Sequence, residues 1–174
     1  MKYRNIEIKN IPSFQRGSSP GREDSVYGLI DFCIDNVKED DTILELGCLN
    51  GASTSVFSFF AKKVISVDIN FSRLEKSFLE KHKNVELIQK SSLDVSDLKI
   101  RYDLLYIDTV HEYNHCTKEL DSLYEFCRSN PKRIGGHDYD FVGVKSAVND
   151  FFGRKPTKIY DDNSWYYETN LKSK

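Results

Sequence analysis

The sequence lacks the features that mark a membrane, secreted or zinc-binding protein. No run of about eighteen apolar residues occurs, so we expect no membrane-spanning helix. The opening stretch MKYRNIEIKNIPSFQRG holds no uninterrupted apolar segment, so we expect no secretory signal. The cysteines form no C-x-x-C pair and have no zinc-ligand spacing; they are Cys33, Cys48, Cys116 and Cys127. Together these absences favour a protein of the cytoplasm.

The chain also lacks a charge bias. Its 25 basic and 27 acidic side chains give a net charge of −2. Such a balance provides no general attraction to nucleic acid or to anionic lipid, so we expect neither as a partner. No internal repeat, low-complexity stretch or linker interrupts the 174 residues. We therefore expect one domain over residues 1–174, in which residues 1–20 form an irregular N-terminal segment.

Apolar stretches alternate with amphipathic ones along most of the chain. Helical spacing predicts helices over residues 22–41, 53–63, 72–82, 115–129 and 143–154. In the first two of these we expect Ile34, Phe59 and Phe60 to face inward. Strands are expected over 42–47, 64–70, 84–92 and 102–113, in a short part of 131–141, and over 157–162 and 165–169. This order predicts an α/β fold with a doubly wound, mostly parallel seven-stranded sheet of the Rossmann-like type, ending in an antiparallel hairpin.

A glycine-containing bend follows the first strand of this series, in the stretch TILELGCLNGAST. Gly47 and Gly51 allow the backbone to turn tightly and to approach a ligand. Leu49 stands where a dinucleotide fingerprint has its middle glycine, and no Gly-Lys-Ser/Thr follows, which excludes a P-loop. Glu45 would repel a phosphate and would tolerate a cofactor that carries positive charge. Asp68 ends the next strand, where an acid can accept hydrogen bonds from ribose hydroxyls.

These segments resemble motifs one and two of class I S-adenosylmethionine-dependent methyltransferases. The resemblance begins with ILELGCLNGAST and VISVDIN, continues through LIQKSSLD, YDLLYIDTVHEY and GGHDYDFVGVKSAV, and covers roughly residues 40–152. The first motif is similar to the E-x-G-x-x-x-G of the catechol O-methyltransferase-like group, which has a serine nearby, here Ser53. The last two segments resemble a branch that includes metal-dependent sugar and macrolide-sugar O-methyltransferases.

The resemblance implies a set of cofactor contacts for S-adenosylmethionine. Gly47 and Gly51 would pack against its methionine part, and Glu45 would brace their loop. The other implied contacts are Asp68 with the ribose, Ser92 beside the adenine, and Asp108 next to the sulfonium and methyl group.

A cation is also expected at this site. Asp108 and Asp138 both follow apolar strands, so both should point into one crevice, where oxygen ligands suit Mg²⁺. The resemblance implies the same two ligands, although Tyr139 stands where relatives have Asn or Asp. His137 would join them around a softer ion such as Mn²⁺. The alternative is that Asp138 caps a turn and binds no ion.

His111 follows Asp108 by three residues, a spacing at which the relatives place a general base. A histidine can take a proton from a hydroxyl near neutral pH. The alternative is a surface histidine on a loop. His82 and His115 are expected to be solvated.

The combined interpretation is a class I S-adenosylmethionine-dependent O-methyltransferase. Its acceptor would be a hydroxyl on a small molecule, such as a sugar or glycan unit, and Asp108 and His111 would be its catalytic residues. Two other functions stay open: a non-catalytic S-adenosylmethionine-binding module and a nicotinamide-dependent oxidoreductase. Association as a homodimer also stays open.

Overall fold

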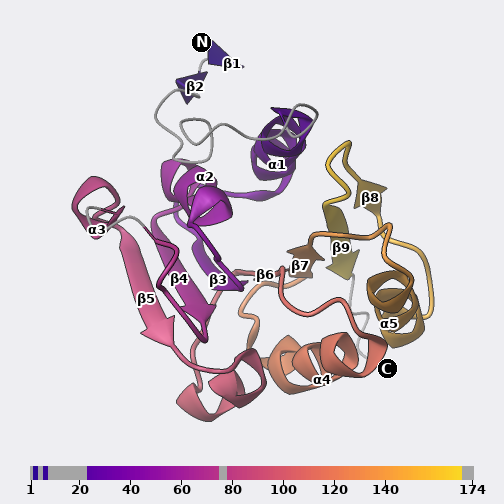
Figure 1. Ribbon diagram of the computed structural model, residues 1–174. Coiled ribbons are helices and arrows are strands. Elements are labelled where there is room, and N and C mark those ends of the chain that lie inside the picture. Colours follow the sequence, from indigo (N-terminus) through magenta and orange to yellow (C-terminus); the bar gives the residue numbers. More distant parts are fainter. Residues whose placement is uncertain (1, 4–5, 8–22, 75–77, 170–174) are drawn as a thin grey trace.

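The computed structural model describes residues 2–3, 6–7, 23–74 and 78–169, and its centre is a seven-stranded sheet (Figure 1). The strand order is β5 (Val85–Gln89), β4 (Lys63–Asp68), β3 (Thr42–Leu46), β6 (Leu104–Ile107), β7 (Lys132–Gly136), β9 (Trp165–Thr169) and β8 (Lys158–Ile159). The first five strands are parallel, and β9 runs antiparallel to both of its neighbours. The predicted fold class, including the antiparallel C-terminal pair, is confirmed.

Helices cover both faces of the sheet (Figure 1). α1 (Glu23–Asn36) and α2 (Ala52–Phe60) pack together on one face, and α4 (Tyr113–Leu123) and α5 (Val142–Phe152) pack together on the other. Two short 3₁₀ helices, η3 (Ser92–Leu98) and η4 (Tyr124–Phe126), lie beside α4. None of the helices in the described ranges has the length and apolar character needed to cross a membrane.

The two central strands are buried on both faces, as parallel strands covered by helices must be. Along β3, Leu44 and Leu46 pack into the core beneath α4 and α5, whereas Ile43 packs beneath α1 and α2. Tyr106 of β6 packs edge-on against Phe32 and Phe57 on that second face. This double burial explains why β6 is a continuous apolar run in the sequence and why β3 is mostly apolar, with Glu45 as its charged exception.

The expected inward faces of the first two helices were partly wrong. Phe59 and Ile34 are exposed, and Phe57 and Phe32 are fully buried in their place. A hydrogen bond sets the orientation of α2. Thr54 faces the sheet because its hydroxyl donates to Glu45, and Phe57, three residues later, lies on the same face of the helix. The helix also ends at Phe60, three residues before the predicted end at residue 63.

Two other segments differ from their expected structure. The helix predicted over 72–82 is reduced to α3 (Phe78–Lys81), with residues 75–77 outside the described ranges. Leu79, Glu80 and Lys81 of α3 are exposed, so these residues gain little from packing, which supplies most of the stability of short helices. In the N-terminal segment expected to be irregular, β1 (Lys2–Tyr3) pairs with β2 (Ile6–Glu7), and residues 8–22 lie outside the described ranges.

Candidate active site

Gly47 makes the turn after β3 possible. Its φ of +84° lies in the left-handed region, and a Cβ added there would stand 1.9 Å from the carbonyl oxygen of Asp108. Its N–H donates to the carbonyl of Val67 at the end of β4, 2.8 Å away. Gly47 therefore brings the loop after β3 into backbone contact with the carboxyl ends of both neighbouring strands.

Two further residues of this turn, Leu49 and Gly51, also have left-handed conformations. Gly51 has φ +79° and stands at the start of α2, where its carbonyl accepts the N–H of Ser55 at 2.9 Å. Leu49, at the middle-glycine position of a dinucleotide fingerprint, has φ +49° and an exposed side chain. A bulky residue in this region is uncommon and points to a turn that the surrounding structure imposes.

Asp68 fixes the turn from the end of β4. Its Oδ2 accepts the N–H groups of Cys48 and Leu49 at 3.0 and 3.1 Å, and its Oδ1 accepts the N–H of Asn70 at 3.0 Å. A carboxylate has further lone pairs, so it can still accept hydroxyl donors. Ile69, an exposed apolar residue that the sequence reasoning passed over, follows directly. The sequence signal for Ile69 is that it directly follows an acid at the end of a strand.

Glu45 is fully buried beneath the turn, on the side of α2. Its carboxylate accepts the hydroxyl protons of Ser53, Ser66 and Thr54, the last at 2.5 Å. Burial raises the pKa of Glu45 to about 7, although these three hydrogen bonds act in the opposite direction. Glu45 and Ser53 thus join β3 to α2 around the bend, and a direct contact of either with a cofactor stays a prediction.

Ser92, beside which the adenine was expected, belongs to a polar cluster at the start of η3. Its Oγ lies 3.2 Å from Nε2 of His115, which is also 3.2 Å from Oε1 of Glu119. Glu119 is fully buried and accepts the hydroxyl of Thr109, the residue after Asp108. Because Ser92 and Glu119 meet the same nitrogen, the cluster is not a serine–histidine–acid relay. Glu119 was missed in the sequence, where nothing distinguishes it from Asp121 and Glu125 on the same predicted helix.

Neither of the two histidines that were expected to be solvated is. His115 is largely enclosed by the cluster just described. His82 is buried, with its two ring nitrogens 3.1 Å from Ser55 Oγ and 2.8 Å from Ser58 Oγ on α2. Burial lowers the pKa of His82, which favours a neutral ring that joins α3 to α2.

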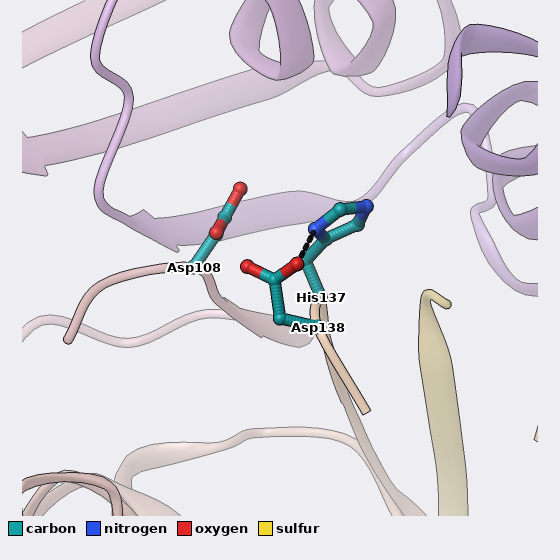
Figure 2. Close-up of side chains that lie close together, drawn as sticks. All are labelled: Asp108, His137 and Asp138. Carbon is teal, nitrogen blue, oxygen red and sulfur yellow. Dashed lines mark ion pairs between the residues drawn. The ribbon is translucent and has the colours of Figure 1, made fainter. Parts of the chain in front are cut away.

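Asp108, His137 and Asp138 gather at the carboxyl ends of β6 and β7 (Figure 2). One potential ligand atom from each lies within 4.8 Å of the others. Because Asp108 follows β6 and the other two residues follow β7, the two strand ends do converge as expected. Within the pair after β7, Nδ1 of His137 lies 3.0 Å from Oδ1 of Asp138. Two carboxylates and an imidazole suit a divalent ion such as Mn²⁺, and the three residues therefore fit a metal site.

Opposite charges in this cluster act on one another's pKa values. Burial raises the pKa of Asp108 to about 6, while the positive charge of His137 opposes the shift. Burial alone would lower the pKa of His137, but its bond to Asp138 and the acids around it raise that pKa to about 9. A metal ion bound by His137 would have to displace this proton, since a ligating imidazole is neutral.

His111 contacts the same cluster. Its Nε2 lies 2.7 Å from Oδ2 of Asp138, and 36% of its side chain is exposed. Asp138 has φ +60°, a left-handed conformation that directs its carboxylate between the two histidines. The structure therefore brings His111, Asp108, Asp138 and His137 together, as the sequence predicted, and gives Asp138 a position from which it can orient His111.

A buried acid that the sequence reasoning missed stands behind His137. Oδ2 of Asp162, in the loop between β8 and β9, lies 3.8 Å from Nε2 of His137 and accepts the hydroxyl of Ser164. Gly28 of α1 leaves room for it, since a Cβ there would lie 2.5 Å from the Asp162 carboxyl group. In the sequence Asp162 is the last residue of the strand predicted over 157–162, and no role was predicted for it.

Open space beside the cluster is small. A cavity of about 10 Å³ lies against Asp108, His111, His137 and Trp165, enough for about one water molecule. A larger hollow of about 660 Å³ lies between the ends of α4 and α5 and the end of β9, beside Phe151, Phe152 and Arg154. Because Thr169 of β9 pairs with Lys132 at the start of β7, this hollow is at the opposite end of the sheet from Asp138.

No family model and no curated protein matches the chain. Its structure, however, is similar to those of several methyltransferases. A protein of Streptococcus mutans, solved with S-adenosylhomocysteine, has 16% identity over 79% of this chain and 92% of its own, with a TM-score of 0.59. The chain has the fold of Rossmann-like methyltransferases.

Two further structures with this fold differ in what they methylate. CalS11, a TDP-rhamnose 3′-O-methyltransferase of calicheamicin biosynthesis, is 12% identical over 92% of this chain and 84% of its own, with a TM-score of 0.60. An rRNA methylase from Streptococcus thermophilus is 14% identical over 79% of this chain and 90% of its own, with a TM-score of 0.53. The fold is shared across acceptors of different classes.

Proposed function

We propose that this protein is a class I S-adenosylmethionine-dependent O-methyltransferase that acts on a hydroxyl of a small molecule, such as a sugar or glycan unit. The observation that carries the proposal is the meeting of the Gly47–Gly51 turn, Asp68 and Asp108 at one edge of the sheet. That edge is the carboxyl end of the strands, where the chain order reverses between β3 and β6, and ligands of open α/β sheets bind there.

The cofactor lies across the turn in this proposal. Asp68 accepts the ribose hydroxyls with the lone pairs that the loop amides leave open, and exposed Ile69 offers an apolar surface to the adenine. Ser92 borders the adenine, and Asp108 faces the sulfonium, whose positive charge a nearby carboxylate favours. The similarity to a structure solved with S-adenosylhomocysteine supports this choice of cofactor.

Methyl transfer is a displacement in which a hydroxyl oxygen attacks the methyl carbon and the sulfur leaves. The protein therefore has to align three atoms and remove one proton. His111 removes the proton, and Asp138, 2.7 Å from its ring, orients it and stabilises the resulting positive charge. CalS11, which by its name methylates a sugar hydroxyl, supports an acceptor of this kind.

Asp108, Asp138 and His137 would hold a divalent ion, for which Mg²⁺ and Mn²⁺ are the candidates. Such an ion supplies Lewis acidity, which lowers the pKa of a hydroxyl. Direct titration of the protein with Mn²⁺, followed by electron paramagnetic resonance, tests this part. Saturable binding that Asp138→Asn weakens supports the site, and equal Mn²⁺ binding by both proteins contradicts it.

Replacement of His111 tests whether the protein is an enzyme or a binding module. Release of S-adenosylhomocysteine is measured with a panel of rhamnosides and catechols as acceptors. We expect His111→Ala to lower kcat by about 10²–10⁴-fold, the usual contribution of a positioned base, and to leave S-adenosylhomocysteine affinity unchanged. His82→Ala, which alters a buried histidine away from the site, is a control for general damage. An unchanged kcat in His111→Ala would rule out this role, and no turnover by the wild type with any acceptor would favour a binding module.

A further inference from the structure

Four large apolar side chains are exposed beside the candidate base. Val110 and Tyr113 flank His111, and Phe141 and Val142 stand at the start of α5. Their exposed fractions are 46, 40, 47 and 78%. We call these four residues the apolar rim. Grouped apolar exposure of this kind marks binding surfaces more often than scattered single residues do.

The two loops that carry the apolar rim are fixed to each other. The ring of Phe141 lies 4.4 Å from that of His111, tilted by 45°. A Cβ added to Gly143 would lie 2.2 Å from the carbonyl oxygen of His111 and 3.0 Å from the nitrogen of Tyr113, so the backbones touch. The apolar rim is therefore preformed and in contact with the residue that we assign as the base.

Phe141 occupies a position at which its residue type gives the helix no benefit. It is the N-cap of α5, where Ser, Thr, Asp or Asn would satisfy a free backbone N–H, and it makes no side-chain cap. Its ring is not buried in the core either. A role in binding accounts for an aromatic side chain at this point, because aromatic faces pack well against apolar rings and chains.

The exposed acids on the loops that carry the apolar rim are Glu112 and Asp140. Residues 109–113 and 139–143 contain no lysine or arginine, and the carboxylate of Asp138 is already paired with His111 and His137. Lys145, one turn further along α5, lies over the ring of Tyr139 at 5.7 Å. Acidic loops repel phosphate groups, so this surface disfavours RNA and nucleotide-linked sugars and suits a neutral ligand.

From these observations we infer that the methyl acceptor is a neutral molecule whose reacting hydroxyl is next to an apolar ring or chain, and that the apolar rim binds this apolar part. The inference rests on the proposed function and narrows its acceptor class. The hydroxyl reaches His111 and Asp108, while the apolar part covers Phe141 and Val142. Desolvation of that part provides binding energy close to the reacting oxygen.

The test compares ligands that differ in apolar and charged parts. With S-adenosylhomocysteine bound, the protein is titrated with methyl rhamnoside, phenyl rhamnoside and TDP-rhamnose, followed by amide chemical shifts. We expect phenyl rhamnoside to bind at least about tenfold more tightly than methyl rhamnoside, since a buried phenyl ring is worth over 1.4 kcal/mol. The shifts should move at Val110, Phe141 and Val142.

Two variants locate the effect. Phe141→Ala and Val142→Asp should each remove the preference for the phenyl compound and leave S-adenosylhomocysteine affinity unchanged. Ile159→Asp, which changes an equally exposed apolar residue on β8, should keep the preference.

Three results would overturn the inference and leave the cofactor assignment standing. They are equal or undetectable binding of the two rhamnosides, tighter binding of TDP-rhamnose, and a dimer in gel filtration that Val142→Asp converts to a monomer. Failure of S-adenosylhomocysteine itself to bind would instead refute the proposed function, and the inference with it.

Discussion

Glu45 is a carboxylate placed where a charge is costly. It is fully buried, its pKa rises from the ordinary value of 4.5 to about 7, and burial is the main cause. Because the folded protein binds this proton more tightly than the unfolded chain, the resulting stability is complete below pH 4.5. It is lost as the pH rises through about 7.

We predict that Glu45→Gln removes this pH dependence. Between pH 4.5 and pH 7.5 the free energy of unfolding of the wild type should fall by on the order of 3 kcal/mol relative to the variant. Urea unfolding at several pH values measures the difference, and Glu39→Gln, at an exposed acid, should behave like the wild type. Parallel pH profiles for Glu45→Gln and the wild type would show that folding does not raise the pKa of Glu45.

At the scale of elements, a buried ion pair connects the sheet to the turn that precedes its central strand. The Arg133 guanidinium on β7 donates to both oxygens of Asp41 at 2.7 Å, and it also donates to the carbonyl of Asn36 at the end of α1. Both charged side chains are buried. Removal of one partner therefore leaves the other charge without compensation in a site of low polarity.

Arg133→Met should accordingly destabilise the protein by about 3–5 kcal/mol. The double variant Arg133→Met/Asp41→Leu should recover much of this loss, since no unpaired charge then remains. Chemical denaturation of the wild type, both single variants and the double variant gives the coupling energy. Additive losses would show that the two side chains do not depend on each other.

The elements that the sequence predicts well are those whose residues are dictated by burial. β6 is apolar throughout and β3 is apolar except for Thr42 and Glu45, because helices cover both of their faces, and their order along the chain implies parallel pairing. The orientation of α2 was not predictable from its apolar residues, because Thr54 and Ser53 turn it toward a buried carboxylate. Asp162 was missed for a similar reason. Its contribution to the site depends on its closeness to His137, and the two residues are not neighbours in the sequence.

At the scale of the whole molecule, the sheet order decides where chemistry can occur. β3 is central, the chain continues to β4 and β5 on one side, and it then crosses to β6 and β7 on the other. The loops after β3, β4 and β6 therefore meet, and Gly47 brings the first of them against the end of β6. Sequence motifs predicted these loops, and the crossover explains why residues from Glu45 to Asp138 lie at the same end of the sheet.

The carboxyl ends of these strands are where we propose that S-adenosylmethionine binds. The most direct test is isothermal titration calorimetry with S-adenosylhomocysteine and NAD, on the wild type, Asp68→Ala and the exposed-acid control Asp97→Ala. We predict one saturable site for S-adenosylhomocysteine, no binding of NAD, and a loss of about 1.5–3 kcal/mol in Asp68→Ala alone, because its carboxylate accepts ribose hydroxyls and fixes the loop. Binding of NAD in place of S-adenosylhomocysteine, or equal S-adenosylhomocysteine affinity in all three proteins, would contradict the account.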